Sequence, residues 1–172
     1  MDGIWIERSY EACSGCRRCE VACSLHHEGR IWPEASRVRV FMLIPGVEIP
    51  HLCFQCEGYP CAGACPSGAL SVDGETGAVK VEASRCTGCG LCIDACPGRV
   101  PHMHPLRGHI VICDLCDGDP ECVKACRLGN WNALKLKPRS GRASPPKTPE
   151  ALTLEVAGRL LDEETAREAL GV

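Results

Sequence analysis

The sequence predicts a small α+β fold of short strands and short helices, in which cross-links replace much of the usual apolar core. Three observations support this prediction. Sixteen cysteines occur among 172 residues. Aromatic residues are only 4% of the chain, and the apolar fraction falls from 45% to about 35% without cysteine, which is low for a single core. Short segments alternate between apolar and polar residues and are separated by turns, a pattern typical of short strands.

One run of cysteines indicates what the cross-links are. Its members are spaced by two, two and three residues, and Pro97 follows the last of them: Cys86, Cys89, Cys92 and Cys96. This is the bacterial run that holds a [4Fe–4S] cluster, in which three thiolates bind one cluster and the fourth binds a second. Gly88 and Gly90 allow the backbone to approach the inorganic sulfurs.

The other cysteines form three similar quartets. The first has the same spacing, while the second and the last have middle gaps of four and five residues. In chain order they are Cys13, Cys16, Cys19 and Cys23; Cys53, Cys56, Cys61 and Cys65; and Cys113, Cys116, Cys122 and Cys126. We number the four quartets in chain order, so the run described above is quartet three. Because the quartets use every cysteine, the sequence predicts four [4Fe–4S] clusters.

Three other uses of the cysteines fit less well. A disulfide scaffold is typical of small secreted chains, but Met1 to Tyr10 lacks the basic start and apolar run of a signal peptide. Zinc ribbons need two distant C-x2-C pairs and have no use for the third and fourth cysteines of each quartet. A redox-active C-x-x-C enzyme needs one pair, not four quartets.

Charge and hydropathy bound the partners and the location. The formal net charge is −3. Sixteen thiolates and four oxidised cluster cores would bring the loaded protein to about −11, which should repel nucleic acid and favour basic partner faces. The apolar runs are far shorter than the ~18 residues of a membrane span, so no membrane insertion is expected. We therefore expect a cytoplasmic protein.

Strands and helices are expected around the quartets. A helix is predicted at residues 19–26, directly after the first quartet. The turn from Asp73 to Gly77 separates two apolar-alternating segments and predicts a hairpin. The predicted strands are residues 4–6, 37–43, 70–72, 79–81, 109–112 and 133–136. Pairing of the first strand with the last would bring the two ends of this region together.

The C-terminal part has a different composition. Residues 138–149 are rich in Pro, Ser, Arg, Lys and Gly and predict a linker, after the cluster-binding domain of residues 1–137. Thr148-Pro149-Glu150 predicts a helix start with Pro149 at the first helical position, and residues 150–172 predict a helical tail. Its apolar stripe is Leu152, Val156 and Leu160, and Asp162 is the expected cap of a second helix. Because such a helix is marginal alone, it is expected to dock, either on a partner or on its own body.

Most of the six histidines are expected to be solvated loop or interface residues, since each cluster already has four thiolates. A histidine ligand is the alternative, because imidazole replaces thiolate in some iron–sulfur centres. The histidines are His26, His27, His51, His102, His104 and His109.

The fourth cysteine of each quartet should cross to another cluster. Proline follows Cys65 and Cys96 but not Cys23 or Cys126, which favours an inner module from quartets two and three and an outer module from quartets one and four. The predicted ligand sets are then Cys13, Cys16, Cys19 and Cys126 (cluster 1); Cys113, Cys116, Cys122 and Cys23 (cluster 2); Cys53, Cys56, Cys61 and Cys96 (cluster 3); and Cys86, Cys89, Cys92 and Cys65 (cluster 4). The alternative pairs quartet one with two and three with four, which gives two modules in sequence.

Residues 1–137 resemble the four-cluster electron-transfer subunits of molybdenum and tungsten oxidoreductases, such as those of dimethyl sulfoxide reductase, formate dehydrogenase and nitrate reductase. The two expanded quartets carry the resemblance, with Pro60 directly before Cys61 and Pro120 two residues before Cys122. The resemblance implies two nested bacterial-ferredoxin-like modules. The compact chain is most similar to the small subunits of tungsten-containing aldehyde oxidoreductases and benzoyl-coenzyme A reductases.

This resemblance implies a non-catalytic subunit that relays electrons. Its partners would be a tungsten- or molybdenum-pterin catalytic subunit and a flavin subunit or a ferredoxin. No phosphate-binding loop, carboxylate pair or nucleophile–base pattern indicates a catalyst. Exposed clusters at both ends would also allow head-to-tail self-association. The alternatives are a stand-alone polyferredoxin, a subunit of a formate dehydrogenase or hydrogenase, and an iron–sulfur regulator or zinc-ribbon module.

If clusters replace the apolar core, iron removal should unfold the chain. We expect a chelated sample to lose most of its far-UV circular dichroism signal. A native-like spectrum without iron would contradict this expectation.

Overall fold

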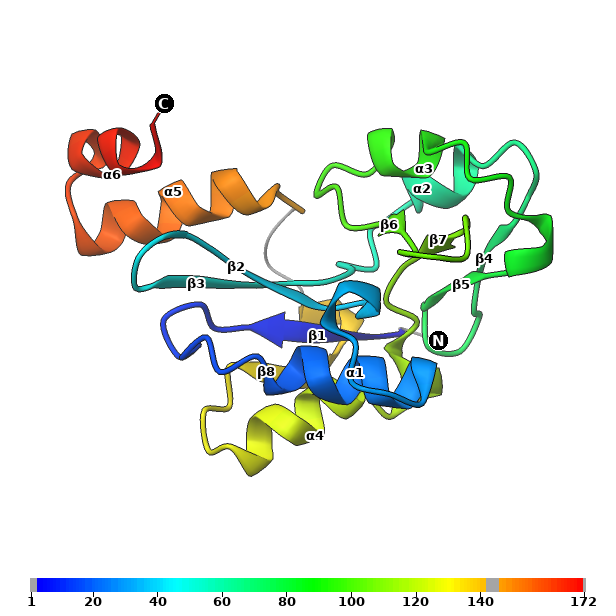
Figure 1. Ribbon diagram of the computed structural model, residues 1–172, viewed down its shortest axis with the longest axis horizontal. Helices are drawn as coiled ribbons and strands as arrows, with labels where there is room; N and C mark the ends of the chain where they lie inside the picture. The colour runs from blue at the N-terminus through cyan, green and yellow to red at the C-terminus, as the bar shows by residue number, and fades with distance from the viewer. Residues whose placement is uncertain (1–2, 142–145, 172) are drawn as a thin grey trace.

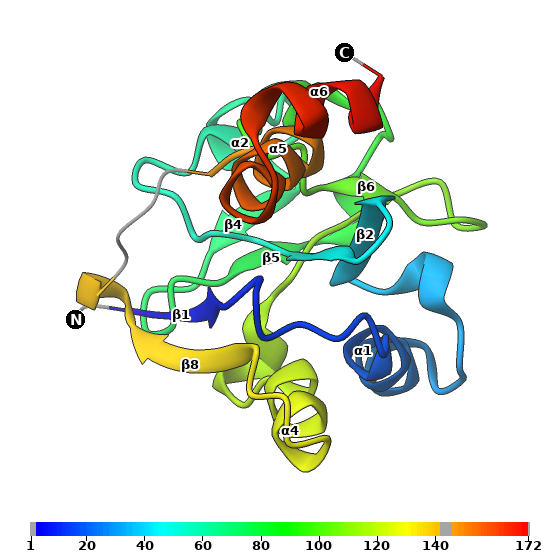
Figure 2. The same cartoon turned by 90° about the vertical axis from the view of Figure 1, so that its left-hand side faces the viewer.

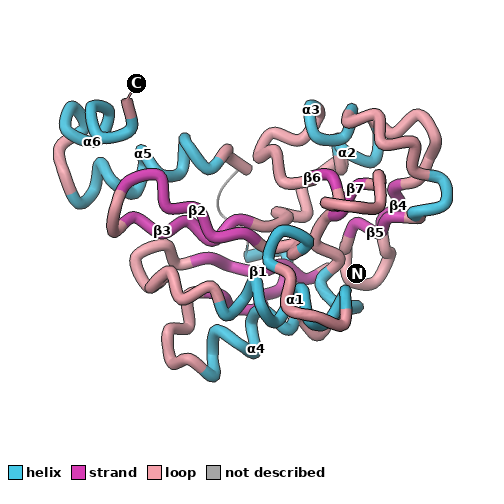
Figure 3. The backbone as a smooth tube through the Cα atoms, viewed as in Figure 1, coloured by secondary structure: helices cyan, strands magenta, loops and turns pink. Residues whose placement is uncertain are grey.

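The computed structural model describes residues 3–141 and 146–171. Within these residues the strands form four two-stranded antiparallel sheets, joined by short helices and long loops (Figures 1 and 3). The small α+β fold is thus the one that the sequence predicts.

The first and last strands of the predicted cluster-binding domain pair with each other. β1 (Ile4–Arg8) lies antiparallel to β8 (Leu134–Pro138), with Ile6 opposite Leu136. This confirms the predicted strand pairing. α1 (Arg18–Glu28) and α4 (Glu121–Leu128) pack against each other below this sheet in Figure 1.

α1 places two cysteines of quartet one on the same face. Cys19 and Cys23 are one helical turn apart, and both are buried. The helix ends at Gly29, which takes the left-handed conformation (φ 66°) and donates its N–H to the carbonyl of Leu25. A residue without Cβ adopts this conformation at no steric cost.

A second group of elements lies on the opposite side of the molecule, at the right of Figure 1. The predicted hairpin is confirmed as β4 (Leu70–Val72) and β5 (Val79–Val81), and the Asp73 carboxylate closes its turn by accepting from Thr76 N at 2.8 Å. The remaining elements here are α2 (Pro60–Gly63), which contacts α3 (Leu91–Asp94), and the pair β6 (His102–Met103) and β7 (Ile110–Val111).

A hairpin between these groups was only half predicted. β2 (Arg39–Ile44) is the strand expected at residues 37–43, whereas β3 (Val47–His51) was not predicted. β3 contains Pro50, which pairs with Val40 in the ladder. Proline has no N–H to donate, so its presence argues against a strand in a sequence-based prediction.

The helical tail lies on the chain's own body. α5 (Pro149–Leu160) covers β2 and β3, and α6 (Glu163–Leu170) follows it (Figure 2). The caps are as expected, with the Thr148 hydroxyl accepting from Ala151 N and the Asp162 carboxylate from Thr165 N. Of the predicted stripe, Leu152 and Val156 are buried, but Leu160 is 63% exposed.

The segment predicted as a linker is partly regular. β8 extends to Pro138, and a 3-10 turn follows at Arg139–Gly141. Arg139 N donates to the carbonyl of Gly3 at 2.8 Å, which continues the β1–β8 ladder. Residues 142–145 of the predicted linker lie outside the described residues.

Four of the six histidines are exposed or half-buried, as expected of most of them, and two are buried: His51 in β3 and His104 in a loop. His51 is enclosed between Phe41 and Phe54, and the His104 side chain lies against Trp32 and Glu28.

No helix within residues 3–141 and 146–171 is long and apolar enough to cross a bilayer.

Glu28, at the end of α1, holds three segments together. Its fully buried carboxylate lies 2.6 Å from Arg37 Nη1, 2.9 Å from Arg107 Nη2 and 3.3 Å from His104 Nε2. Burial alone would raise the pKa of Glu28, but the hydrogen bonds from Arg37 and His104 hold the pKa below its ordinary value. The carboxylate is therefore charged at neutral pH and compensates cations that are partly withdrawn from water.

We expect Glu28→Gln to lower the free energy of unfolding by about 3 kcal/mol at pH 7, because it leaves Arg37 without its counter-charge. The apparent Tm of the anaerobic protein should fall by about 6–12 °C. Because the folded pKa is depressed, the difference from the native chain should persist above pH 5 and narrow as pH falls through the folded pKa. The exposed Glu34→Gln is the control and should leave Tm unchanged. Equal Tm values for both variants would contradict the assigned role.

Candidate metal centres

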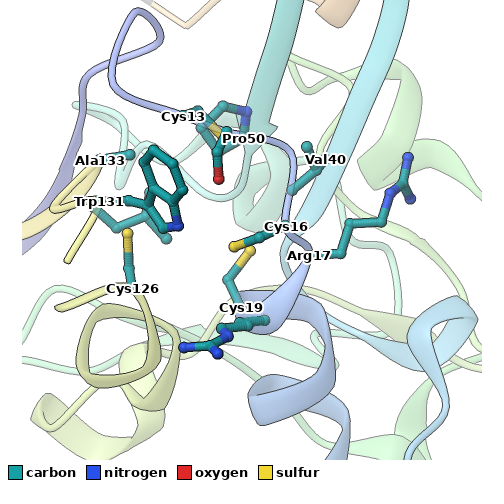
Figure 4. Close-up of a pocket in the computed structure, with 12 residues that line it drawn as sticks. Cys13, Cys16, Arg17, Cys19, Val40, Pro50, Cys126, Trp131 and Ala133 are labelled. Atoms are coloured by element: carbon teal, nitrogen blue, oxygen red, sulfur yellow. The ribbon is translucent and has the colours of Figure 1, made fainter. Parts of the chain in front are cut away.

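Cysteines from both ends of the predicted cluster-binding domain line one hollow of about 330 Å³. Its four cysteines are Cys13, Cys16, Cys19 and Cys126. Figure 4 shows the sulfurs of Cys16, Cys19 and Cys126 around this space, with the Trp131 indole beside it. The structure thus brings together three cysteines of quartet one and the last cysteine of quartet four.

The loop of quartet one needs a glycine. Gly15 has φ +68°, and a Cβ there would lie 2.6 Å from the carboxylate carbon of Glu48. The side chain of Glu48, a residue of β3, therefore lies directly against this loop. Any larger residue at position 15 would displace either the loop or the carboxylate.

A second hollow, of about 300 Å³, has an equivalent composition. Its four cysteines are Cys65, Cys86, Cys89 and Cys92. Three come from quartet three and one from the end of quartet two. Gly88 (φ +67°) and Gly90 (φ +81°) turn the loop in the left-handed conformation, as their type predicts.

A third set of four thiols is more deeply buried. Burial raises the pKa of Cys53 to about 12, and the nearby thiols of Cys61, Cys56 and Cys96 contribute to the rise. Burial also raises the pKa of Cys61 to about 11, and Cys96 is the thiol that adds most to this rise. Quartet two thus meets the last cysteine of quartet three.

The fourth set includes the buried thiols of Cys113 and Cys122. Burial raises the pKa of Cys122 well above its ordinary value, and the thiols of Cys23, Cys19 and Cys116 add to this effect. The pKa of Cys113 rises for the same reason, with contributions from Cys122, Cys53 and Cys23. Quartet four therefore meets the last cysteine of quartet one.

The same electrostatic effects between thiols also indicate which sets are neighbours. Cys19 lies close enough to Cys122 to affect its pKa, which places the first hollow beside the set that contains Cys122. Cys53 is likewise close to Cys113, which places the two most buried sets side by side.

The surroundings of the sulfurs suit anionic, metal-bound thiolates. Several backbone N–H groups donate to sulfurs, among them Arg37 N to Cys23 Sγ at 3.2 Å, Gln55 N to Cys53 Sγ at 3.4 Å and Val100 N to Cys96 Sγ at 3.4 Å. In the third set, free thiols with raised pKa values would be protonated at neutral pH, so iron must displace their protons on binding. Sulfur donors in sets of four, with N–H groups aimed at them, fit iron–sulfur clusters.

The histidine-ligand alternative has one point of contact. His26, His27 and Cys116 place their ligand atoms within 4.8 Å of one another, and His27 Nε2 lies 3.8 Å from Cys116 Sγ. His27 Nε2 is also 3.4 Å from the Asp114 carboxylate. His27 therefore lies behind a cysteine that belongs to a complete set of four thiols, where it can donate to the sulfur.

Comparison with known proteins agrees with this geometry. Residues 46–135, more than half of the chain, match the family model of the 4Fe-4S dicluster domain, and residues 10–25 match that of a 4Fe-4S binding domain. The chain belongs to the 4Fe-4S dicluster domain family. The chain is an iron–sulfur electron-transfer protein that binds several [4Fe–4S] clusters.

Several known proteins are similar to this chain. The aliphatic sulfonate oxidoreductase, polyferredoxin-like subunit of Pyrococcus furiosus is 50% identical over 169 residues, which cover 95% of this chain and 96% of that protein. The electron transport protein HydN of Escherichia coli K12 is 36% identical over 139 residues, covering 66% and 78%. A chain of the active site complex BamBC of benzoyl coenzyme A reductase is 26% identical, with 98% of both chains covered and a TM-score of 0.45.

Sequence reasoning named the cysteines but missed the groups around them. The N–H donors of Arg37 and Val100, the cover that Glu48 provides over Gly15 and the contact of His27 all depend on tertiary packing. No local pattern indicates them. Only the glycines within the loops carry a signal that can be read from the sequence.

Proposed function

We propose that this chain is a non-catalytic electron-transfer subunit that carries four [4Fe–4S] clusters in a row. One observation supports the proposal: two hollows are each lined by three cysteines of one quartet and the last cysteine of another, and electrostatic effects among the other thiols fit the same pattern. The proposed sets are Cys13, Cys16, Cys19 and Cys126; Cys113, Cys116, Cys122 and Cys23; Cys53, Cys56, Cys61 and Cys96; and Cys86, Cys89, Cys92 and Cys65. We keep the numbers 1 to 4 for the clusters in this order.

The nested arrangement follows from these sets. Quartets one and four would form an outer module, which the packing of α1 on α4 and the pairing of β1 with β8 support. Quartets two and three would form an inner module, supported by the contact of α2 with α3. The proposed cluster-binding domain spans residues 1–137, and the tail is a separate cover on β2 and β3.

Neighbouring thiols suggest the order of the row. Cys19 beside Cys122 links clusters 1 and 2, and Cys53 beside Cys113 links clusters 2 and 3. The crossing ligands Cys65 and Cys96 link clusters 3 and 4. The two exposed cysteines, Cys16 and Cys89, then belong to the two ends of the row, where electrons can enter and leave.

Each bound cluster would accept and release one electron at a time. The chain's own residues hold the row in place and set its energetics. Backbone donors at Cys23, Cys53 and Cys96 stabilise negative charge on sulfur, and burial of these sulfurs excludes water from the middle of the row. The exposed Cys16 and Cys89 leave the end clusters accessible to partners.

The proposed partners are a catalytic subunit and an electron donor or acceptor. The relative that is 50% identical is named as a subunit of an aliphatic sulfonate oxidoreductase. We therefore propose a tungsten- or molybdenum-pterin oxidoreductase of the aldehyde oxidoreductase type at one end, and a flavin subunit or a ferredoxin at the other. A row with two accessible ends also permits head-to-tail assembly of copies.

A stand-alone polyferredoxin is the second candidate. It is favoured by the tail, since α5 covers the chain's own β2 and β3, and Leu152 and Val156 are already buried there. The two candidates differ in purification. A subunit should co-purify with a pterin-containing chain from its native cells, whereas a shuttle should elute alone.

The proposal requires about sixteen iron and sixteen sulfide per chain in the anaerobic protein. Stoichiometric zinc would contradict it. The ligand sets predict that Cys13→Ser combined with Cys126→Ser affects a single cluster, so that about twelve irons remain. The sequential alternative places these two cysteines on different clusters and predicts about eight.

The matched control combines Cys13→Ser with Cys23→Ser. These cysteines come from the same quartet but from different proposed sets, so about eight irons should remain. Equal iron contents of about eight in both double variants would exclude the nested sets.

A further inference from the structure

The arginine at the end of β1 points into the interior of the protein. Arg8 Nη2 donates to the carbonyl of Cys53 at 2.6 Å and to that of Leu52 at 3.0 Å. Its guanidinium lies 3.9 Å from the centre of the Phe54 ring. The Arg8 Nε is enclosed and has no hydrogen-bond partner within the described residues. The side chain is therefore fixed against the second quartet.

No carboxylate compensates this cation within residues 3–141 and 146–171. Tyr10 is close to Arg8, but burial raises the pKa of Tyr10, so its phenol is neutral at pH 7. A hollow beside Arg8 is also lined by Glu155. The Glu155 carboxylate, however, forms ion pairs with Lys147 at 2.6 Å and with Arg159 at 2.7 Å. Burial lowers the pKa of Arg8, but a guanidinium remains charged at neutral pH.

Arg8 is half-buried with its Nε enclosed, and a cation withdrawn from water without a counter-charge is destabilising. Arg8 forms cation–π contacts and hydrogen bonds to neutral carbonyls, and these stabilise a cation without cancelling its charge. Water in the hollow beside Arg8 would solvate the guanidinium but would not neutralise it. The required anion must therefore come from groups that gain their charge when the protein is complete.

The groups that gain charge are thiols. After Tyr10, the side chains that act electrostatically on Arg8 are Cys53, Cys113 and Cys122. Cys53 belongs to proposed cluster 3, and the other two belong to proposed cluster 2. A cluster with four thiolates carries a net negative charge in its oxidised form and gains one more on reduction. Arg8 thus lies near two negatively charged clusters in the middle of the proposed row.

We infer that Arg8 is the counter-cation of the two middle clusters and raises their reduction potentials. This inference rests on the proposed ligand sets. A fixed positive charge in a medium of low dielectric stabilises the reduced, more negative form more than the oxidised form. The middle of the row is buried and would otherwise disfavour electrons. Through its charge, Arg8 keeps these two clusters able to accept electrons that arrive from the ends of the row.

The test compares three variants by redox titration followed with electron paramagnetic resonance. Arg8→Gln removes the charge and keeps an amide that can donate to the Cys53 carbonyl. Arg8→Lys keeps the charge. Lys137→Met removes a charge from an exposed residue opposite Trp5 on β8, where solvent screens it, and is the matched control.

We expect Arg8→Gln to lower two of the four potentials, with the reduction equilibrium weakened about tenfold, which is about 59 mV for one electron. Arg8→Lys should return both potentials toward the native values, and Lys137→Met should shift none. Unchanged potentials in Arg8→Gln, or equal shifts in Arg8→Gln and Arg8→Lys, would overturn the inference.

Iron content separates this inference from the proposed function. If native protein lacks about sixteen irons, the proposed function fails. If native protein has them and Arg8→Gln does not shift two potentials, only the role of Arg8 fails. If Arg8→Gln cannot load its clusters while Arg8→Lys can, charge compensation is supported. If neither variant loads, Arg8 acts through its hydrogen-bond geometry, and the inference is wrong.

Discussion

Bonding between cysteine thiolates and iron is the interaction on which the rest of this structure depends. Nine of the sixteen cysteines are buried, and burial raises the pKa of several of them to about 11 or 12. A chain that places so many thiols in its interior gains little from them as apolar groups. Bound metal turns the same atoms into anchors, because binding free energy at such sites contributes directly to folding.

The regular elements are short, and the sheets are two-stranded within the described residues. The helices α1 and α4 each carry two cysteines. Apolar residues such as Ile6, Ile49 and Leu115 fill the space between the metal sites. The tail adds Leu152 and Val156 to this core by packing on β2 and β3. The apolar residues, the buried cysteines and the tail therefore pack into one continuous core.

Much of this arrangement is predictable from the sequence, because the informative residues are local. Cysteine spacing predicted the quartets, and turn residues predicted the β4–β5 hairpin. Caps at Thr148 and Asp162 predicted the tail helices. What failed depends on tertiary contacts. β3 was missed because of Pro50. The burial of His51 and His104 was not predicted, because the residues that enclose them are distant in sequence.

The most direct test of the account is the position of iron in a crystal of the anaerobic protein, determined by anomalous diffraction at the iron edge. The account predicts four compact iron sites in the order 1, 2, 3 and 4, with the first bound by Cys126 and the second by Cys23. An iron site that joins Cys23 to the cysteines of quartet two, or fewer than four sites in fully loaded protein, would contradict it.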